Sequence, residues 1–208
     1  MPKPGEPLIP EGALVLFQGD SVTDCGRKFD GTEDLGAGYV PIIAGWCAAV
    51  HPCRKLNFVN RGIGGDTVKE LKARWKEDCL DIRPAWVSIL IGVNGCLRPD
   101  AGDFEVEYRD ILSQTRDTIG SRLVLMEPFI IPSAEDRRIH RGVLEKRIDI
   151  VRNLAAEYGA ILVPLDKILN KACTVKPPAW WAGDGLHPTT AGNTLIARSW
   201  LEATGLLG

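Results

Sequence analysis

The stretch ALVLFQGDS, residues 13–21, decides the fold. The apolar run over residues 13–17 is typical of a strand that is buried on both faces within a parallel sheet. Gly19 permits a sharp turn after that run, so Asp20 and Ser21 are expected at the carboxyl end of the strand. Open parallel sheets bind their ligands beyond the carboxyl ends of the strands, which makes Ser21 a candidate functional residue. An Asp-Ser pair also caps turns frequently, and the stretch alone does not separate the two roles.

Short apolar runs of the same kind recur along the chain and alternate with helical patterns. In addition to residues 13–18, strands are predicted over residues 57–61, 86–91, 122–126 and 160–165. Apolar residues at helical spacing predict a helix from Val68 to Cys79 with Asp66 as its N-cap, and a long helix over residues 139–154. A last helix is expected just after His187, with Pro188 at an early helical position and Thr189 or Thr190 helping to cap it.

This alternation predicts an α/β fold, in which right-handed crossovers join parallel strands and place helices on both faces of the sheet. The expected architecture is a three-layer α/β/α sandwich with a five-stranded parallel sheet. The chain has 208 residues, and it contains no internal repeat, low-complexity tract or linker long enough to separate two units. We therefore expect a single domain over residues 1–208.

Composition argues against several classes of partner. The formal net charge of −2 provides no field that would attract nucleic acid or an anionic membrane. No apolar run is long enough for a transmembrane helix, and the N-terminus lacks the apolar stretch of a signal peptide, so a cytoplasmic protein is expected. The six cysteines are irregularly spaced and form no C-x-x-C pair, and there are only three histidines. We expect mostly free thiols, no dedicated metal site and no cofactor.

Two further segments after predicted strands offer groups that can stabilise negative charge. The stretch NRGIGGDT, residues 60–67, follows the second strand and opens a helix, so that the amide of Gly65 can donate to an oxyanion. The plain alternative is a strand-to-helix turn capped by Asp66. The stretch GVNG, residues 92–95, follows the third strand, and the side-chain amide of Asn94 is a neutral donor. Asn94 is equally compatible with an ordinary turn position.

The stretch DGLH, residues 184–187, supplies a carboxylate and an imidazole three residues apart. A neutral histidine can take a proton from a serine hydroxyl, and a carboxylate bound to its other ring nitrogen fixes the tautomer. The alternative interpretation is that His187, which lies beside the start of a helix, makes only a structural contact. Ser21, His187 and Asp184 together provide a nucleophile, a base and an orienting group, which indicates a serine esterase.

These four segments, in this order, resemble those of the SGNH (GDSL) hydrolase superfamily. The matching residues are the GDS of residues 19–21, Gly65 in the glycine-rich stretch, Asn94, and Asp184 with His187. The resemblance implies a flavodoxin-like SGNH hydrolase fold and a catalytic triad of Ser21, Asp184 and His187. It also implies an oxyanion hole formed by the backbone N–H groups of Ser21 and Gly65 and by the side chain of Asn94.

Further motifs resemble one branch of the superfamily, the bacterial acetylxylan esterases and related carbohydrate deacetylases. They are TDCGR (residues 23–27), LGAGYV (35–40), LKARW (71–75) and PAWVSILIG (84–92). That branch usually reads Gly-x-Asn-Asp followed by Val-Trp-Arg, whereas this chain reads GVNGCLR over residues 92–98. Gly95-Cys96-Leu97 therefore lacks a carboxylate and an aromatic wall near the site, which bears on the rate and on substrate preference.

The expected activity is hydrolysis of short-chain esters, acetyl esters above all, on carbohydrate through an acyl-enzyme. The expected substrate is a small-molecule ester or an acetylated oligosaccharide. Two alternatives stay open: a short-chain carboxylesterase, thioesterase or lysophospholipase with the same triad, and a non-catalytic ligand-binding protein of flavodoxin-like shape. Asp20, Arg98 and Trp181 are candidate substrate contacts. For Trp181, packing of the loop onto the body of the protein is an equal alternative.

The resemblance also implies a homo-oligomer, because relatives of this kind often assemble. The apolar C-terminal residues Trp200, Leu201, Leu206 and Leu207 are compatible with a subunit interface. They are equally compatible with a role in completing the core of one chain.

Overall fold

The computed structural model describes residues 8–30, 33–98, 102–132 and 140–208. Its centre is a sheet of five parallel strands in the order β2-β1-β3-β4-β5. The strands are β1 (Leu14–Gly19), β2 (Asn57–Asn60), β3 (Trp86–Leu90), β4 (Arg122–Met126) and β5 (Ile161–Val163). The predicted strands and the parallel α/β architecture are thus confirmed, with strand ends displaced by at most two residues.

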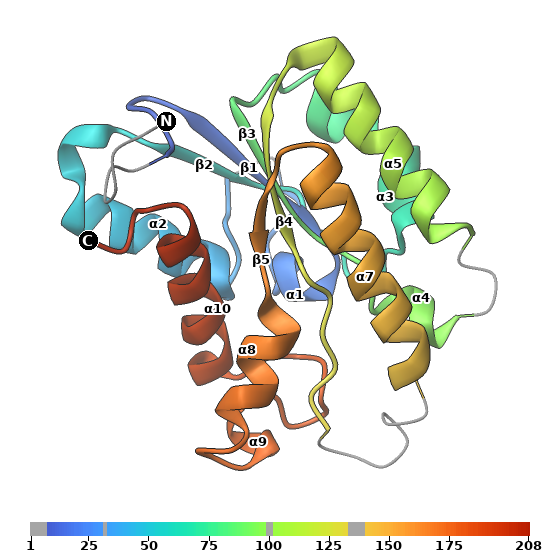
Figure 1. The fold of residues 1–208 in the computed structure, drawn as a ribbon. Coiled ribbons are helices and arrows are strands. Elements are labelled where there is room, and N and C mark those ends of the chain that lie inside the picture. The colour runs from blue at the N-terminus through green and yellow to red at the C-terminus, as the bar shows by residue number, and fades with distance from the viewer. Residues whose placement is uncertain (1–7, 31–32, 99–101, 133–139) are drawn as a thin grey trace.

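Helices cover both faces of the sheet, as Figure 1 shows. One face carries α2 (Tyr39–Val50), α8 (Leu165–Ala172) and α10 (Thr190–Ala203), whose buried side chains join one apolar cluster. The other carries α3 (Val68–Ala73), α5 (Phe104–Gln114) and α7 (Arg141–Glu157), which join a second cluster. The short elements are α1 (Ser21–Asp24), η1 (Pro52–Arg54), η2 (Lys76–Leu80), α4 (Asn94–Leu97), η3 (Thr115–Ile119) and α9 (Pro178–Trp181).

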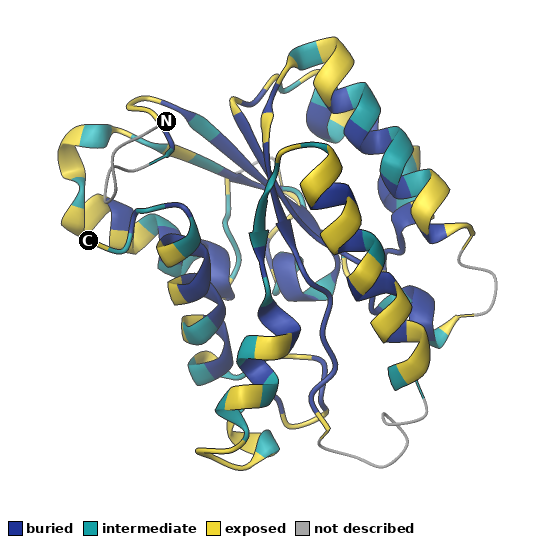
Figure 2. Ribbon diagram, viewed as in Figure 1, coloured by how far each residue is buried: buried dark blue, intermediate teal, exposed yellow. Residues whose placement is uncertain are grey.

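The two clusters follow from the alternation of side chains along each strand. In β1, Val15 and Phe17 face the cluster of α2 and α10, whereas Leu16 faces that of α3, α5 and α7. All three side chains have no exposed surface, and Figure 2 shows the central strands buried between the two helix layers. A strand without a polar face therefore reads in the sequence as a continuous apolar run.

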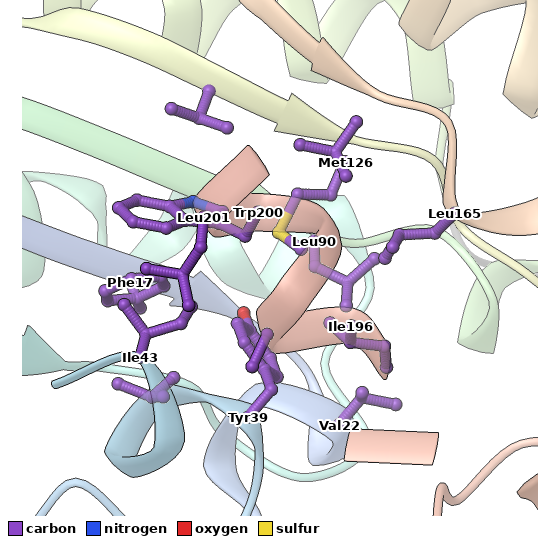
Figure 3. Close-up of a cluster of buried hydrophobic side chains, with 14 of the residues drawn as sticks. Phe17, Val22, Tyr39, Ile43, Leu90, Met126, Leu165, Ile196, Trp200 and Leu201 are labelled. Atoms are coloured by element: carbon purple, nitrogen blue, oxygen red, sulfur yellow. The ribbon is translucent and has the colours of Figure 1, made fainter. Parts of the chain in front are cut away.

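The C-terminal apolar residues complete the core. In the cluster drawn in Figure 3, the ring of Trp200 lies 5.3 Å from that of Phe17, centroid to centroid. The indole Nε1 of Trp200 donates to Ser88 Oγ at 3.0 Å, so its one polar atom is satisfied inside the core. Leu201 and Leu206 are also buried. These three side chains are therefore used within one chain.

Several helix boundaries differ from the prediction. The N-cap of α3 is Thr67, which forms a capping box with Glu70, whereas the predicted cap Asp66 pairs with an arginine side chain instead. The predicted helix to Cys79 is interrupted, because α3 ends at Ala73 and a π-helical turn follows. The long helix is confirmed from Arg141, and residue 139 lies outside the described residues.

The last helix begins later than expected. Thr189 is the N-cap of α10, and its hydroxyl accepts a hydrogen bond from the Gly192 N–H at 3.3 Å, as predicted. Pro188 consequently precedes the helix rather than opening it. All six cysteines are free thiols in the structure. Within the described ranges, no helix combines the length and apolar character that crossing a bilayer would require.

Candidate active site

Ser21 is the first residue of α1, directly after β1. The strand passes into this helix through Gly19, where a Cβ would overlap the carbonyl oxygen of Leu90 and the side chain of Thr23. Only glycine allows the backbones to approach so closely. Asp20 caps the helix, because its Oδ1 accepts from the N–H of Val22 at 3.1 Å. The hydroxyl of Ser21 is therefore fixed at the carboxyl edge of the sheet.

His187 and Asp184 meet this hydroxyl from the loop before α10. Ser21 Oγ lies 3.0 Å from His187 Nε2, and His187 Nδ1 lies 2.6 Å from Asp184 Oδ2. The other carboxylate oxygen, Asp184 Oδ1, accepts from the N–H of Leu186 at 2.9 Å and from that of His187 at 2.8 Å. One short loop thus holds the carboxylate by two backbone bonds and aims it at the imidazole.

The electrostatics of the loop keep Asp184 charged. Partial burial raises the pKa of Asp184, but the backbone and side-chain hydrogen bonds from His187 and the backbone bond from Leu186 outweigh it. The resulting pKa is about 2. A carboxylate that is ionised throughout the neutral range favours the imidazole tautomer with its proton on Nδ1, which leaves Nε2 free to accept from Ser21.

The glycine-rich segment lies beside Ser21. The N–H of Gly64 donates to Asp24 Oδ2 at 2.9 Å, and a Cβ at Gly64 would be 3.8 Å from the Cβ of Ser21. Gly65 has a φ of +85°, in the left-handed region that favours glycine, and a Cβ there would meet no atom within 4 Å. The space that a side chain at position 65 would occupy is therefore open.

Asn94 joins this segment from the third strand. It begins α4, and its Nδ2 donates to the carbonyl of Asp66 at 2.9 Å. Arg98, at the other end of α4, donates from Nη1 to the carbonyl of Gly65 at 3.1 Å and forms an ion pair with Glu70. The structure therefore brings the glycine-rich segment and Asn94 together, and it uses the guanidinium of Arg98 to hold that segment.

Of the candidate substrate contacts, Asp20 is buried and Trp181 is partly buried. Asp20 is only 2% exposed, and burial raises the pKa of its carboxyl to about 7, although the bond from Val22 and the nearby His187 oppose this shift. Its observed role is that of a helix cap lining a small cavity with apolar side chains. Trp181 donates from Nε1 to the carbonyl of Lys176 at 3.3 Å and packs, partly buried, against the core.

Arg74 joins two segments of the site through hydrogen bonds. It was not identified as a site residue from the sequence. Its guanidinium donates to Asp66 Oδ2 at 2.8 Å, to the carbonyl of Arg61 at 2.7 Å and to that of Gly19 at 3.3 Å. It also contacts Gln18 Oε1 and Asp78 Oδ2, each at 2.9 Å. One side chain therefore joins the end of β1 to the segment after β2.

Comparison with known proteins identifies the family of this chain. Residues 17–195 match the GDSL-like Lipase/Acylhydrolase family. The chain is 34% identical to an acetylxylan esterase of Geobacillus stearothermophilus over 212 residues, covering 95% of this chain and 96% of that protein. The crystal structure of Axe2, an acetylxylan esterase from Geobacillus stearothermophilus, superposes with a TM-score of 0.88 at 34% identity, again over 95% and 96% of the two chains.

A second solved structure, a GDSL-like lipase from Parabacteroides merdae, gives a TM-score of 0.88 at 33% identity, with 95% of this chain and 98% of that chain covered. These similarities define a carboxylic ester hydrolase. The chain belongs to the GDSL-like lipase/acylhydrolase family and has the SGNH hydrolase fold.

Proposed function

We propose that the protein is a serine esterase that removes short acyl groups, acetyl above all, from carbohydrate esters. The observation that carries the proposal is the continuous hydrogen-bonded chain from Ser21 Oγ through His187 to the ionised Asp184. A binding protein would need no such chain, because its elements serve to move a proton away from a serine hydroxyl. The hydroxyl lies at the edge of the sheet where ligands of open α/β folds bind.

In the proposed reaction, His187 Nε2 takes the proton of Ser21 as its Oγ attacks the ester carbonyl carbon. The tetrahedral intermediate collapses when His187 returns that proton to the leaving alkoxide, which departs as the alcohol. Water, deprotonated by the same imidazole, then attacks the acyl-enzyme and releases the carboxylic acid with restoration of Ser21. Asp184 stabilises the imidazolium that forms in each half of the reaction.

Three donors are proposed to bind the oxyanion: the backbone N–H groups of Ser21 and Gly65, and Asn94 Nδ2. The first N–H groups of a helix have no partner within that helix, and Ser21 opens α1. Gly64 lies beside Ser21, and Asn94 is bonded to the same segment as Gly65. Loss of one such donor typically lowers the rate about 10²–10³-fold.

Acetylated xylo-oligosaccharide is the proposed substrate because of the relatives. The similar Geobacillus protein is an acetylxylan esterase, and a solved structure of it describes the enzyme as an acetyl-xylooligosaccharide esterase. Its solved catalytic mutants replace a serine, an aspartate and a histidine, the last two being three positions apart. Asp184 and His187 have the same spacing in this chain.

A panel of esters tests the proposal. Initial rates are measured on 4-nitrophenyl acetate, butyrate and octanoate and on acetylated xylobiose, with Ser21→Ala as the control. We expect acetate and acetylated xylobiose to be preferred and Ser21→Ala to be inactive. A preference for octanoate would favour a lipid-directed esterase with the same triad. No hydrolysis of any ester, or full activity of Ser21→Ala, would refute the proposal.

A further inference from the structure

A buried arginine on α7 holds the segment that carries Asn94. Arg147 is 8% exposed, and its Nη1 and Nη2 donate to the carbonyls of Gly92 and Gly95, each at 2.8 Å. These two carbonyls lie on either side of Asn94 in the chain. A single rigid guanidinium therefore bridges the turn from which the Asn94 side chain projects.

The surroundings of Arg147 show that this contact is costly for the fold. Its Cζ lies 4.7 Å from the ring centroid of Phe104, and burial lowers the pKa of Arg147. Among the residues that the structure describes, no carboxylate lies within ion-pair distance of it. A buried charge with backbone carbonyls as its partners is more expensive than an apolar side chain of similar volume, so packing alone does not account for it.

Gly95 provides the space that the guanidinium occupies. A Cβ at this position would overlap Nη1 and would lie 2.7 Å from both Cζ and Nη2 of Arg147. The absence of a side chain at Gly95 therefore leaves the room that the guanidinium needs.

Asn94 is consequently fixed from two directions. Its own Nδ2 is bonded to the carbonyl of Asp66, and the backbone on both sides of it is bonded to Arg147. The apolar side chains Val93 and Cys96 belong to one buried cluster with Leu144 and Ile148 of α7. Polar and apolar side chains of α7 thus both help to hold the Asn94 segment.

We propose that Arg147 is a positioning residue for the esterase reaction, holding the segment of residues 92–95 so that the Asn94 amide meets the oxyanion, and that Gly95 is required to admit it. The inference rests on the proposed function, in which Asn94 is an oxyanion donor. Because that donor bond forms fully only in the transition state, misplacement of Asn94 lowers kcat and leaves KM nearly unchanged.

The first test replaces Arg147 by methionine, which keeps an unbranched apolar stem and removes the guanidinium with its donors. We expect kcat on 4-nitrophenyl acetate to fall about 10–10²-fold, below the about 10²–10³-fold limit for complete loss of one donor. KM should change less than about threefold, and the acid limb of the pH profile should stay in place, because His187 and Asp184 are untouched. Lys146→Met, an exposed neighbour on α7 with the same change of charge, is the matched control and should be as active as the parent.

A double-mutant cycle with Asn94→Ala separates positioning from a general loss of structure. If Arg147 acts through Asn94, adding Arg147→Met to Asn94→Ala should lower kcat by less than about twofold. Losses that multiply would overturn the inference. Thermal unfolding of each variant establishes that the enzymes compared are folded.

A second cycle uses Gly95 and does not depend on Asn94. Gly95→Ala should lower kcat in the parent enzyme, because its Cβ displaces the guanidinium, but it should have little effect in Arg147→Met, where the guanidinium is gone. Equal losses in both backgrounds would overturn the inference. If the parent enzyme hydrolyses no ester, or if Ser21→Ala remains active, the proposed function fails. If the parent is active, Ser21→Ala is inactive and the losses in kcat of the paired variants multiply, only the proposed role of Arg147 fails.

Discussion

Replacing Asp184 by asparagine should nearly abolish turnover while leaving the protein stable. In the structure, Asp184 Oδ1 accepts from two backbone N–H groups, at 2.9 and 2.8 Å, and Oδ2 faces His187 Nδ1 at 2.6 Å. Asparagine can keep both backbone bonds only with its carbonyl oxygen in the place of Oδ1. Its NH₂ group then donates to Nδ1 and forces the imidazole proton onto Nε2, where it faces Ser21 and blocks proton transfer.

The size of the effect follows from the two backbone bonds. Turning the amide over would lose both, at about 1 kcal/mol each, and would set donors against donors. The unproductive tautomer is thus favoured by at least about 2 kcal/mol, roughly 30-fold, before the lost stabilisation of the imidazolium is counted. The total expected loss in kcat is on the order of 10⁴-fold, the loss known for this change in a serine triad.

The variant Asp184→Ala separates the effect of the wrong imidazole tautomer from the effect of losing the carboxylate. Alanine removes both acceptors of the loop, so this variant should be about 2 kcal/mol less stable than Asp184→Asn. It leaves His187 free to adopt either tautomer, and its kcat should therefore equal or exceed that of the asparagine variant. The assays are initial rates on 4-nitrophenyl acetate and thermal unfolding. A folded Asp184→Asn variant that retains more than about a tenth of the parent kcat would refute the reasoning.

Three other changes test the framework of the site. Asp20→Asn keeps the helix cap but cannot ionise. Burial raises the pKa of the Asp20 carboxyl to about 7, so its contribution to stability is complete below about pH 4 and is lost as the pH rises through about 7; Asp66 raises this pKa further and His187 lowers it. The melting temperature of Asp20→Asn relative to the parent should therefore rise between pH 4 and 8, and a constant difference would contradict the burial argument. Arg74→Met leaves Asp66 and Asp78 without their shared guanidinium and should cost about 3 kcal/mol of unfolding free energy in urea, whereas the exposed control Lys76→Met should cost less than about 1 kcal/mol. Equal losses of unfolding free energy in these two variants would show that Arg74 contributes no more to stability than the exposed Lys76. Gly62→Ala should lower the melting temperature by several degrees, because a Cβ there would lie 2.8 Å from the carbonyl carbon of Thr23, and an unchanged melting temperature would show that this approach is not tight.

The central strands β1, β3 and β4 could be predicted because they are buried on both faces along nearly their whole length. In β1 the side chains of Val15, Leu16 and Phe17 have no exposed surface, so the apolar run in the sequence is uninterrupted. The same logic placed Ser21 and Asn94 at one edge, since the carboxyl ends of parallel strands meet there. The proximity of Ser21, His187 and Asp184 followed from the topology and from the motifs.

Details that depend on contacts distant in sequence could not be predicted. Asp66 and Thr67 are both good helix caps, and the choice between them is made by Arg74, which takes the Asp66 carboxylate. The T-x-x-E pattern of Thr67 and Glu70 was the available local signal for the capping box. Nothing local in the sequence connects Arg147 with Gly95, because 52 residues separate them and only the fold brings them together.

Two candidate substrate contacts have structural partners that the sequence did not reveal. Asp20 follows a strand and precedes the serine, which is compatible with either a substrate contact or a cap. The structure shows a buried cap. Arg98, another candidate substrate contact, donates to the carbonyl of Gly65 with its side chain partly exposed, and its contact with substrate stays a prediction.

The most direct test of the account is to identify the residue that reacts with a fluorophosphonate, which forms a stable adduct with an activated serine. Peptide mapping by mass spectrometry should locate the adduct on Ser21. Labelling should be lost in His187→Ala and should be slowed when 4-nitrophenyl acetate competes for the site. An adduct on another serine, or undiminished labelling of Ser21 without His187, would contradict the central claim that Ser21 is a nucleophile activated by His187.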